Sequence, residues 1–289
     1  MGNEKLQNRG HLFLLHLAVM MFGFSGVISR AVQVSAITLA GGRVICSSAI
    51  LFLLLKIKKE SLRAKSRRDL MLTLLAGALL AVHWTTFFQS VQVASVAIGT
   101  ITFSTFPLFL LFLEPLLYKE PISGRNILLS MGLLLGVFIT IPEFSLANGT
   151  TMGILWGMIC SLTYALLTLC NRTLAASYSG MWVSFREQST AALLLLPFVL
   201  IRKESFQTGD LLGIAAIGVI CTALAFSLFV TAQKSISAQT VGIVAGMETV
   251  YGILFAGILL REMPSIREII GGIVILAVAM LSTLSTGKK

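Results

Sequence analysis

Long apolar runs separated by short polar segments dominate the pattern along the chain. A helix needs about 20 mostly apolar residues to cross a bilayer, and only helices and closed barrels satisfy the backbone in lipid. Barrel strands would alternate apolar and polar positions, and these runs do not. We therefore predict an all-α integral membrane protein with ten transmembrane helices, at His11–Ile28, Ala36–Leu55, Leu70–Val91, Ser95–Leu117, Asn126–Ile141, Met152–Leu169, Met181–Ile201, Leu211–Ala232, Thr240–Leu260 and Ile266–Leu284.

The composition agrees with lipid as the solvent of this chain. Of its 289 residues, 56% are hydrophobic and only 12% are charged, whereas a soluble domain carries about 25% charged residues. Such a chain has too few charged residues to form a polar surface in water. The first run follows Lys5 and Arg9, as in a signal peptide. Because nine further spans come after it, we expect an uncleaved first helix.

The net charge of +10 suggests a nucleic-acid partner only until the charges are located. Seven basic residues lie in the segment KIKKESLRAKSRRD between the second and third spans. Cytoplasmic loops carry an excess of Lys and Arg. With the N-terminus inside, the inside segments hold 15 of the 22 Lys and Arg residues and the outside segments hold 5. We therefore predict that both termini are cytoplasmic and that the basic residues report orientation, with no nucleic-acid partner.

The chain also contains an internal repeat. LLYKEPIS, from Leu116, resembles LLREMPS, from Leu259. Three pairs of charged residues share an offset of 142 or 143 positions, namely Glu120 with Glu262, Arg30 with Arg172 and Arg43 with Arg186. We predict two five-helix units, residues 1–144 and 145–289. Since five is odd, the second unit starts from the opposite face of the membrane, and such inverted repeats are typical of secondary transporters.

These motifs make the chain similar to the drug/metabolite transporter superfamily, and specifically to its ten-helix EamA-type family. The resemblance rests on the turns at Lys119-Glu120-Pro121 and Arg261-Glu262-Met263-Pro264, and on Arg43 and Arg186, and it covers nearly the whole chain. It implies a secondary transporter that exports amino acids or related metabolites across a bacterial inner membrane, proton-linked or facilitative. The family tends to have a Pro thirteen residues before each turn Glu, often preceded by an acid in the second repeat. The first of these prolines is present as Pro107. At the second position the chain has Thr249 instead of Pro, and the preceding acid is present as Glu248.

Glu248 is the only charged residue in its span. A charge at that depth costs about 2.5–3.5 kcal/mol on insertion scales. One interpretation is a proton-coupling group or a binder of an ammonium-type substrate, with Tyr251 on the same face at i+3 donating to it. The other is a structural hydrogen bond to a neighbouring helix.

Aromatic and polar residues in two other spans are further candidates for a substrate site. His83 and Phe87 share a face at i, i+4, and Trp84 lies on the adjacent face; aromatic walls suit organic substrates. The alternatives are an interfacial Trp anchor and a lipid-facing Phe. Tyr164 and Thr168 lie one turn apart in another span. One interpretation is that they line a cavity between the repeats, and the other is that they pack against neighbouring helices without a role in binding.

Other polar span residues are predicted to have structural or gating roles. Arg43 and Arg186 pair with carbonyls, a Glu or headgroups, or else gate the pathway or bind a substrate carboxylate. Pro107 kinks its helix, and the carbonyl it frees faces a cavity or is satisfied by Thr102 or Ser104. Glu120 and Glu262 cap or lock loops at span ends.

No motif of an enzyme, a cofactor or a metal site is present in the sequence. Cys46, Cys160, Cys170 and Cys221 lie inside predicted spans without a CxxC and read as packing residues. We predict a transporter of a small molecule, with protons as a possible second partner, no cofactor and no enzymatic activity. The alternatives are a transporter of cationic drugs or quaternary amines, an importer, or a membrane-embedded lipid enzyme or accessory protein. An enzyme would gather its ionisable groups, which in the sequence are scattered singly. The sequence leaves the oligomeric state open.

Overall fold

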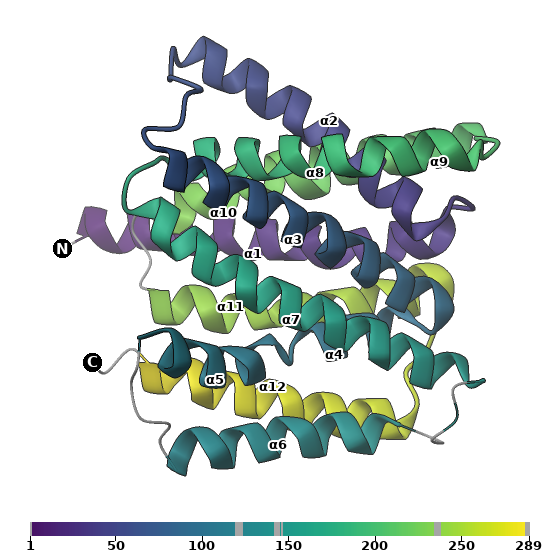
Figure 1. Cartoon of the computed structure of the whole chain (residues 1–289). Helices are drawn as coiled ribbons and strands as arrows, with labels where there is room; N and C mark the ends of the chain where they lie inside the picture. Colours follow the sequence, from purple (N-terminus) through teal and green to yellow (C-terminus); the bar gives the residue numbers. More distant parts are fainter. Residues whose placement is uncertain (1, 119–123, 142–144, 146, 234–237, 287–289) are drawn as a thin grey trace.

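The computed structural model describes residues 2–118, 124–141, 145, 147–233 and 238–286, and their regular structure is entirely helical (Figure 1). The all-α prediction is confirmed for these residues. Two segments, η1 and η2, are π-helices. The elements in chain order are α1 (Gly2–Ala31), α2 (Ala36–Ile57), α3 (Arg67–Val93), α4 (Val96–Phe103), α5 (Phe106–Tyr118), α6 (Gly124–Thr140), α7 (Gly149–Ala175), α8 (Gly180–Arg202), α9 (Thr208–Gly218), η1 (Val219–Leu224), α10 (Ala225–Gln233), α11 (Ala238–Phe255), η2 (Ala256–Leu260) and α12 (Ile266–Thr286).

Six helices in the described part of the chain are long and apolar enough to cross a membrane. They cover Gly10–Ala31, Ala36–Ile57, Arg67–Val93, Val96–Leu117, Gly149–Ala175 and Thr208–Phe229. Two shorter apolar helices, Ile127–Thr140 and Val244–Leu260, accompany them. α8 is not one of these six, although it has 23 residues, and its sequence includes the charged residues Arg186 and Glu187. The chain is therefore a multi-pass membrane protein, and the number of ten crossings stays a prediction.

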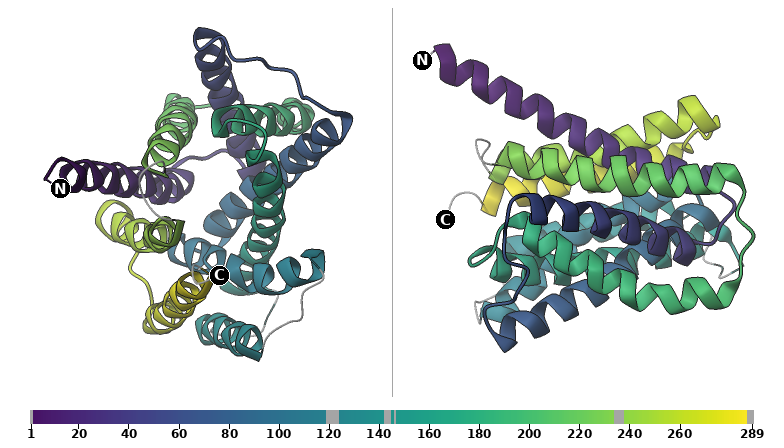
Figure 2. Two further views of the ribbon diagram at one scale, coloured as in Figure 1. Left: turned by 90° about the vertical axis from the view of Figure 1, so that its left-hand side faces the viewer. Right: turned by 90° about the horizontal axis from the view of Figure 1, so that it is seen from above.

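The helices lie roughly along one direction in an elongated array (Figures 1 and 2). α2 and α8 pack together at one end of the array, and α6 packs with α12 at the other. The start of α1, the end of α12 and the connection from α2 to α3 lie on the same side (Figure 1). This arrangement places the basic loop on the side of both terminal helix ends.

Helices at equivalent positions of the two sequence copies pack antiparallel at the α6–α12 end. A Cβ atom built on Gly132 would lie 3.0 Å from Val278, and one built on Gly136 would lie 2.5 Å from Ile275. The contact moves backward along α12 as it moves forward along α6. Because α12 follows α6 by the repeat offset, this is the packing expected of an inverted repeat.

The equivalent pair at the other end shows the same relation. A Cβ atom on Gly41 of α2 would lie 2.7 Å from Val199 of α8, and further along α2 the Ser47 hydroxyl donates to the Gln188 side chain. α2 and α8 are therefore antiparallel too. Glycines let such helix backbones approach closely, which is how helices associate in lipid.

The predicted fourth span is interrupted, because α4 ends at Phe103 and α5 begins at Phe106, next to Pro107. Pro107 has no N–H for the Phe103 carbonyl, four residues earlier. We expected a cavity, Thr102 or Ser104 to compensate for this, but the Ser161 hydroxyl of α7 lies 3.0 Å from that carbonyl and 2.8 Å from the Thr102 carbonyl. The break is therefore satisfied from the second sequence copy.

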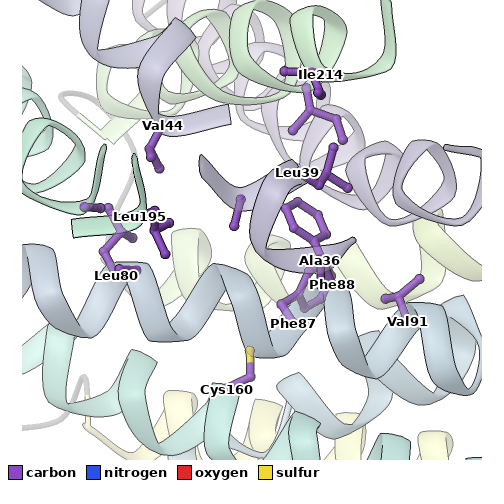
Figure 3. Close-up of a cluster of buried hydrophobic side chains, with 14 of the residues drawn as sticks. Ala36, Leu39, Val44, Leu80, Phe87, Phe88, Val91, Cys160, Leu195 and Ile214 are labelled. Atoms are coloured by element: carbon purple, nitrogen blue, oxygen red, sulfur yellow. The ribbon is translucent and has the colours of Figure 1, made fainter. Parts of the chain in front are cut away.

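The largest cluster of buried apolar side chains joins α2, α3 and α8 with parts of α7 and α9 (Figure 3). Phe87 and Phe88 of α3 are almost fully buried in this cluster, which also includes Leu39 and Val44 of α2 and Leu195 of α8. In lipid, van der Waals packing of complementary surfaces drives helix association. This cluster fixes the positions of α2, α3 and α8 relative to one another.

Candidate functional site

A cavity of about 180 Å³ lies between the two sequence copies. The first copy supplies side chains from α1, α2, α3 and α4, and the second supplies them from α7, α8, η1, α10 and α11. Most of the lining is aromatic or aliphatic, with a small number of polar side chains. An apolar wall with a few convergent polar groups is the usual composition of a small-molecule site.

Equivalent positions of the two copies both contribute to the lining of this cavity. Five pairs of lining residues differ by the repeat offset of 142, namely Phe22 with Tyr164, Leu80 with Thr222, Trp84 with Phe226, Phe87 with Phe229 and Phe103 with Ala245. The cavity therefore surrounds the pseudo-two-fold axis that relates the copies.

The charged side chains that line the cavity do not follow this symmetry. Arg43 of α2 is the arginine among them. The Arg43 side chain is almost fully buried, and its guanidinium carbon lies 3.2 Å from the centroid of the Trp84 ring. Nη2 lies 3.5 Å from the Cys221 carbonyl of η1, whereas Nε and Nη1 have no hydrogen-bond partner. A desolvated cation–π contact contributes about 2 kcal/mol. Arg43 therefore joins α2, α3 and η1 while leaving two donors unused.

Glu248 of α11 is the first of two carboxylates that line the cavity. It is half-buried and interacts electrostatically with Arg43. The next residue, Thr249, stands where the family resemblance leads us to expect Pro. Its hydroxyl lies 3.1 Å from the Thr100 carbonyl and 2.6 Å from the Ser104 hydroxyl. Thr249 thus joins an unbroken α11 to the end of α4 and fixes the position of Glu248.

Glu187 of α8 is the second carboxylate, and its side chain is almost fully buried. Its Oε1 has no hydrogen-bond partner, while Asn171 of α7 lies within hydrogen-bonding reach of the carboxyl group. No salt bridge joins Glu187 to a cation within the described ranges. A buried carboxylate costs several kcal/mol unless it is paired, so the Glu187 carboxyl is the least compensated acidic group in the cavity.

His83 of α3 is also buried at the cavity wall. Its Nδ1 lies 3.1 Å from the Cys160 carbonyl, which accepts a hydrogen from that nitrogen. In a neutral imidazole the other nitrogen, Nε2, is then an acceptor. The ring also packs against Trp84, Phe103 and Tyr164.

The structure separates the predicted site residues into two groups. Glu248, His83, Trp84, Phe87, Tyr164 and Arg43 line the cavity. The Tyr251 hydroxyl, which we expected to donate to Glu248, lies 2.8 Å from Nδ1 of His16 on α1. The Thr168 hydroxyl donates to the Tyr164 carbonyl of its own helix, and the Arg186 guanidinium lies 5.9 Å from the Trp182 ring. Neither residue lines the cavity.

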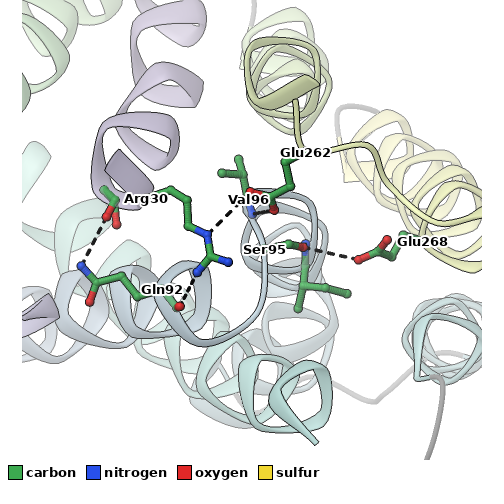
Figure 4. Close-up of polar contacts among 8 residues, drawn as sticks. Arg30, Gln92, Ser95, Val96, Glu262 and Glu268 are labelled. Carbon is green, nitrogen blue, oxygen red and sulfur yellow. Dashed lines mark hydrogen bonds and ion pairs between the residues drawn. The ribbon is translucent and has the colours of Figure 1, made fainter. Parts of the chain in front are cut away.

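Glu262, one of the predicted structural residues, lies between η2 and α12 and contacts the ends of two other helices. Glu262 accepts a hydrogen bond from the Val96 N–H (2.9 Å) at the start of α4, and its other oxygen lies 3.7 Å from Nε of Arg30 (Figure 4). Ser95 donates to Glu268 beside it. A carboxylate at a helix N-terminus satisfies free N–H groups there. The α11–α12 connection is thereby attached to α1 and α4, whereas Glu120 lies outside the described residues.

Glu204, in the connection between α8 and α9, is a further carboxylate with several partners. Glu204 accepts a hydrogen bond from the Ser35 N–H. Burial raises the pKa of the Glu204 carboxyl, but hydrogen bonds from Ser35, Thr38 and Arg202 outweigh it and leave the pKa below its ordinary value.

Sequence reasoning missed several lining residues. Phe226 and Phe229 could have been predicted, because adding the repeat offset of 142 to Trp84 and Phe87 gives their positions. Glu187 and Asn171 carry no such signal. The ionisable groups are also not scattered as we expected, because the fold brings Arg43, His83, Glu187 and Glu248 to one cavity. Sequence spacing does not reveal this, because the four groups come from four different helices.

The contact between α1 and α11 places Glu248 at the cavity and is sensitive to side-chain size. A Cβ atom on Gly23 would lie 2.8 Å from the Glu248 carbonyl oxygen and 2.9 Å from the Gly252 nitrogen. Backbone atoms cannot rotate away. We therefore expect Gly23→Ala to lower the free energy of unfolding by about 1–3 kcal/mol, measured as a lower midpoint of thermal unfolding in detergent. Gly10→Ala, on the same helix with no atom within 4 Å of the new Cβ, is the control, and equal midpoints for the two variants would contradict this packing.

Comparison with known proteins agrees with this architecture. The EamA-like transporter family matches residues 9–141 and again residues 151–284. This chain belongs to the EamA-like transporter family. The two matches coincide with the two sequence copies, so the family assignment is confirmed.

Relatives of this EamA-like protein are described as transporters. An uncharacterized transporter of Bacillus subtilis (strain 168) is 22% identical over 270 residues, which cover 90% of this chain and 85% of that protein. An uncharacterized transporter of Archaeoglobus fulgidus is 28% identical over 196 residues, covering 68% and 69%. A solved crystal structure aligns with a TM-score of 0.66 at 16% identity, covering 96% of this chain and 99% of that one. These similarities support a membrane transporter, and the structural match shows the fold.

Proposed function

We propose that this EamA-like protein is a secondary transporter of a small organic metabolite, an amino acid or related compound. In this proposal it exports the metabolite across the bacterial inner membrane by alternating access and carries out no enzymatic reaction. Grouping α4 with α5, α9 with η1 and α10, and α11 with η2 gives ten crossings, five for each repeat.

The observation that carries the proposal is the position of the cavity. Its walls come from equivalent positions of both copies, and substrate sites of inverted-repeat transporters lie at that interface. Rocking of one copy against the other would open such a site alternately to the two sides. A lipid-modifying enzyme would instead need its ionisable groups at one membrane face, whereas Glu248, His83 and Arg43 lie well inside their helices.

The size and chemistry of the cavity favour a small polar metabolite over a bulky drug. Its volume of about 180 Å³ is below the roughly 300–1,000 Å³ of sites that enclose drug-sized ligands. Arg43 keeps two donors without partners, which suits a carboxylate, since guanidinium and carboxylate groups form strong paired hydrogen bonds.

The orientation in this proposal has both termini in the cytoplasm. The basic segment after α2 lies on the side of the α1 start and the α12 end (Figure 1), and Lys and Arg are enriched in cytoplasmic loops.

A panel of radiolabelled amino acids, amines and organic acids, tested for counterflow in proteoliposomes against empty liposomes, tests the function. We expect exchange of at least one amino acid or close relative. Exchange of none of these compounds by a correctly folded protein would contradict the proposal.

Glu248 is the residue that we expect to couple transport to protons. Glu248→Gln removes the ionisable group but keeps its shape, so we expect it to abolish the response of uptake to a pH gradient while the protein stays folded. The measurement compares uptake with and without an imposed gradient, together with thermal unfolding. Unchanged uptake with unchanged pH dependence would rule out the coupling role.

A further inference from the structure

The charges around the cavity do not balance. Arg43 and Glu248 act on one another electrostatically, so one carboxylate has a cation in the same cavity. No ion pair joins Glu187 to Arg43 or to another cation in the part of the chain that the structure describes. Within the described residues, the cavity therefore contains one carboxylate without a compensating cation.

The neighbouring arginine does not fill this role. Arg186 is adjacent in sequence, but successive helical residues point about 100° apart. Its guanidinium is directed towards Trp182, and it does not line the cavity. Glu187, in contrast, is buried with Oε1 unpartnered.

Glu187 and Arg43 also lie at different levels of the cavity. The hydrogen bond from Ser47 to Gln188 sets the register of α2 against α8. Arg43 precedes Ser47 by four residues, or roughly 6 Å along the helix. The Glu187 backbone therefore lies about one helical turn from the Arg43 backbone along the interface of α2 and α8.

We propose that Glu187, with Asn171 beside it, forms a subsite for a protonated nitrogen of the transported molecule. An ammonium group would donate to the free Oε1 and supply the missing positive charge. The aromatic rings of Phe22, Tyr164 and Phe229 would surround the carbon skeleton. This inference rests on the proposed transport function and identifies the residue that recognises the cationic end of the substrate.

The test uses three probes of equal chain length, n-butylammonium, 1-butanol and butyrate, with the purified full-length protein in detergent. A ligand that binds the folded state raises the midpoint of thermal unfolding. We expect n-butylammonium to raise the midpoint of the wild-type protein more than the other two probes do. In Glu187→Gln its apparent affinity should fall at least about tenfold, because a charge-assisted hydrogen bond is lost.

Two further variants separate a binding role from a structural one. Glu187→Asp keeps the charge and should retain part of the n-butylammonium effect. Glu60→Gln removes a carboxylate outside the cavity and should behave like the wild type. An n-butylammonium effect that is absent in the wild type, or unchanged in Glu187→Gln, would overturn the subsite. If counterflow then still proceeds, the proposed transport function stands without this subsite; if wild-type counterflow is absent, the function itself fails.

Discussion

Replacing Arg43 with alanine is expected to lower the free energy of unfolding by about 2–5 kcal/mol, the range for truncating a large buried side chain. Arg43 is buried against the Trp84 ring and donates to the Cys221 carbonyl of η1. Its removal deletes those contacts and leaves Glu248 without its cation. The measurement is thermal unfolding in detergent together with the yield of folded protein.

Two variants identify the cause of that loss. Arg202→Ala removes an exposed arginine whose salt bridge to Glu204 spans 3.4 Å, and exposed pairs contribute about 0–1 kcal/mol. We expect its midpoint to stay near that of the wild type. Adding Glu248→Gln to Arg43→Ala should recover part of the stability, because the uncompensated charge is then gone. Equal midpoints for Arg43→Ala and Arg202→Ala would show that Arg43 has no buried structural role.

The repeat is the part of this fold that the sequence predicts best. Offsets between charged residues survive in apolar sequence because aliphatic residues replace one another freely, whereas Arg30, Arg43 and Glu262 have few substitutes. The same offset relates Trp84 to Phe226 and Phe87 to Phe229, all of which line the cavity. The general location of the site could therefore be predicted from the sequence, because candidate lining residues in one repeat give the equivalent positions in the other.

The partners of individual side chains were not accessible in this way. Spacing places Tyr251 on the face of Glu248, yet its hydroxyl reaches His16 of α1. The repeat directed attention to Arg186, whereas Glu187, one residue on, lines the cavity. A helix turns only one of two adjacent residues towards a given neighbour, and which residue it is depends on how the helices pack.

Thr249 is another residue whose contacts cannot be predicted from the sequence alone. Its departure from the family's usual Pro is visible in the sequence, but its consequence is not. The hydroxyl bonds to the Thr100 carbonyl and to Ser104 at the end of α4. The role of Thr249 thus depends on residues that lie 145 and 149 positions away in the chain.

Replacing Ala245 with tryptophan is expected to have the largest effect on transport. Ala245 of α11 lines the cavity at the position equivalent to Phe103. An indole there would occupy most of a space of about 180 Å³ without removing a charge or a hydrogen bond. Leu254→Trp is the matched control, because Leu254 lies on the same helix with 54% of its surface exposed.

The central claim is that this cavity is the transport pathway, and counterflow by these two variants in proteoliposomes tests it most directly. The labelled solute is the one that wild-type protein exchanges fastest, and thermal unfolding confirms that both variants are folded. We predict that Ala245→Trp reduces the rate of exchange at least about tenfold while Leu254→Trp exchanges like the wild type. Exchange by folded Ala245→Trp at the wild-type rate would contradict the account.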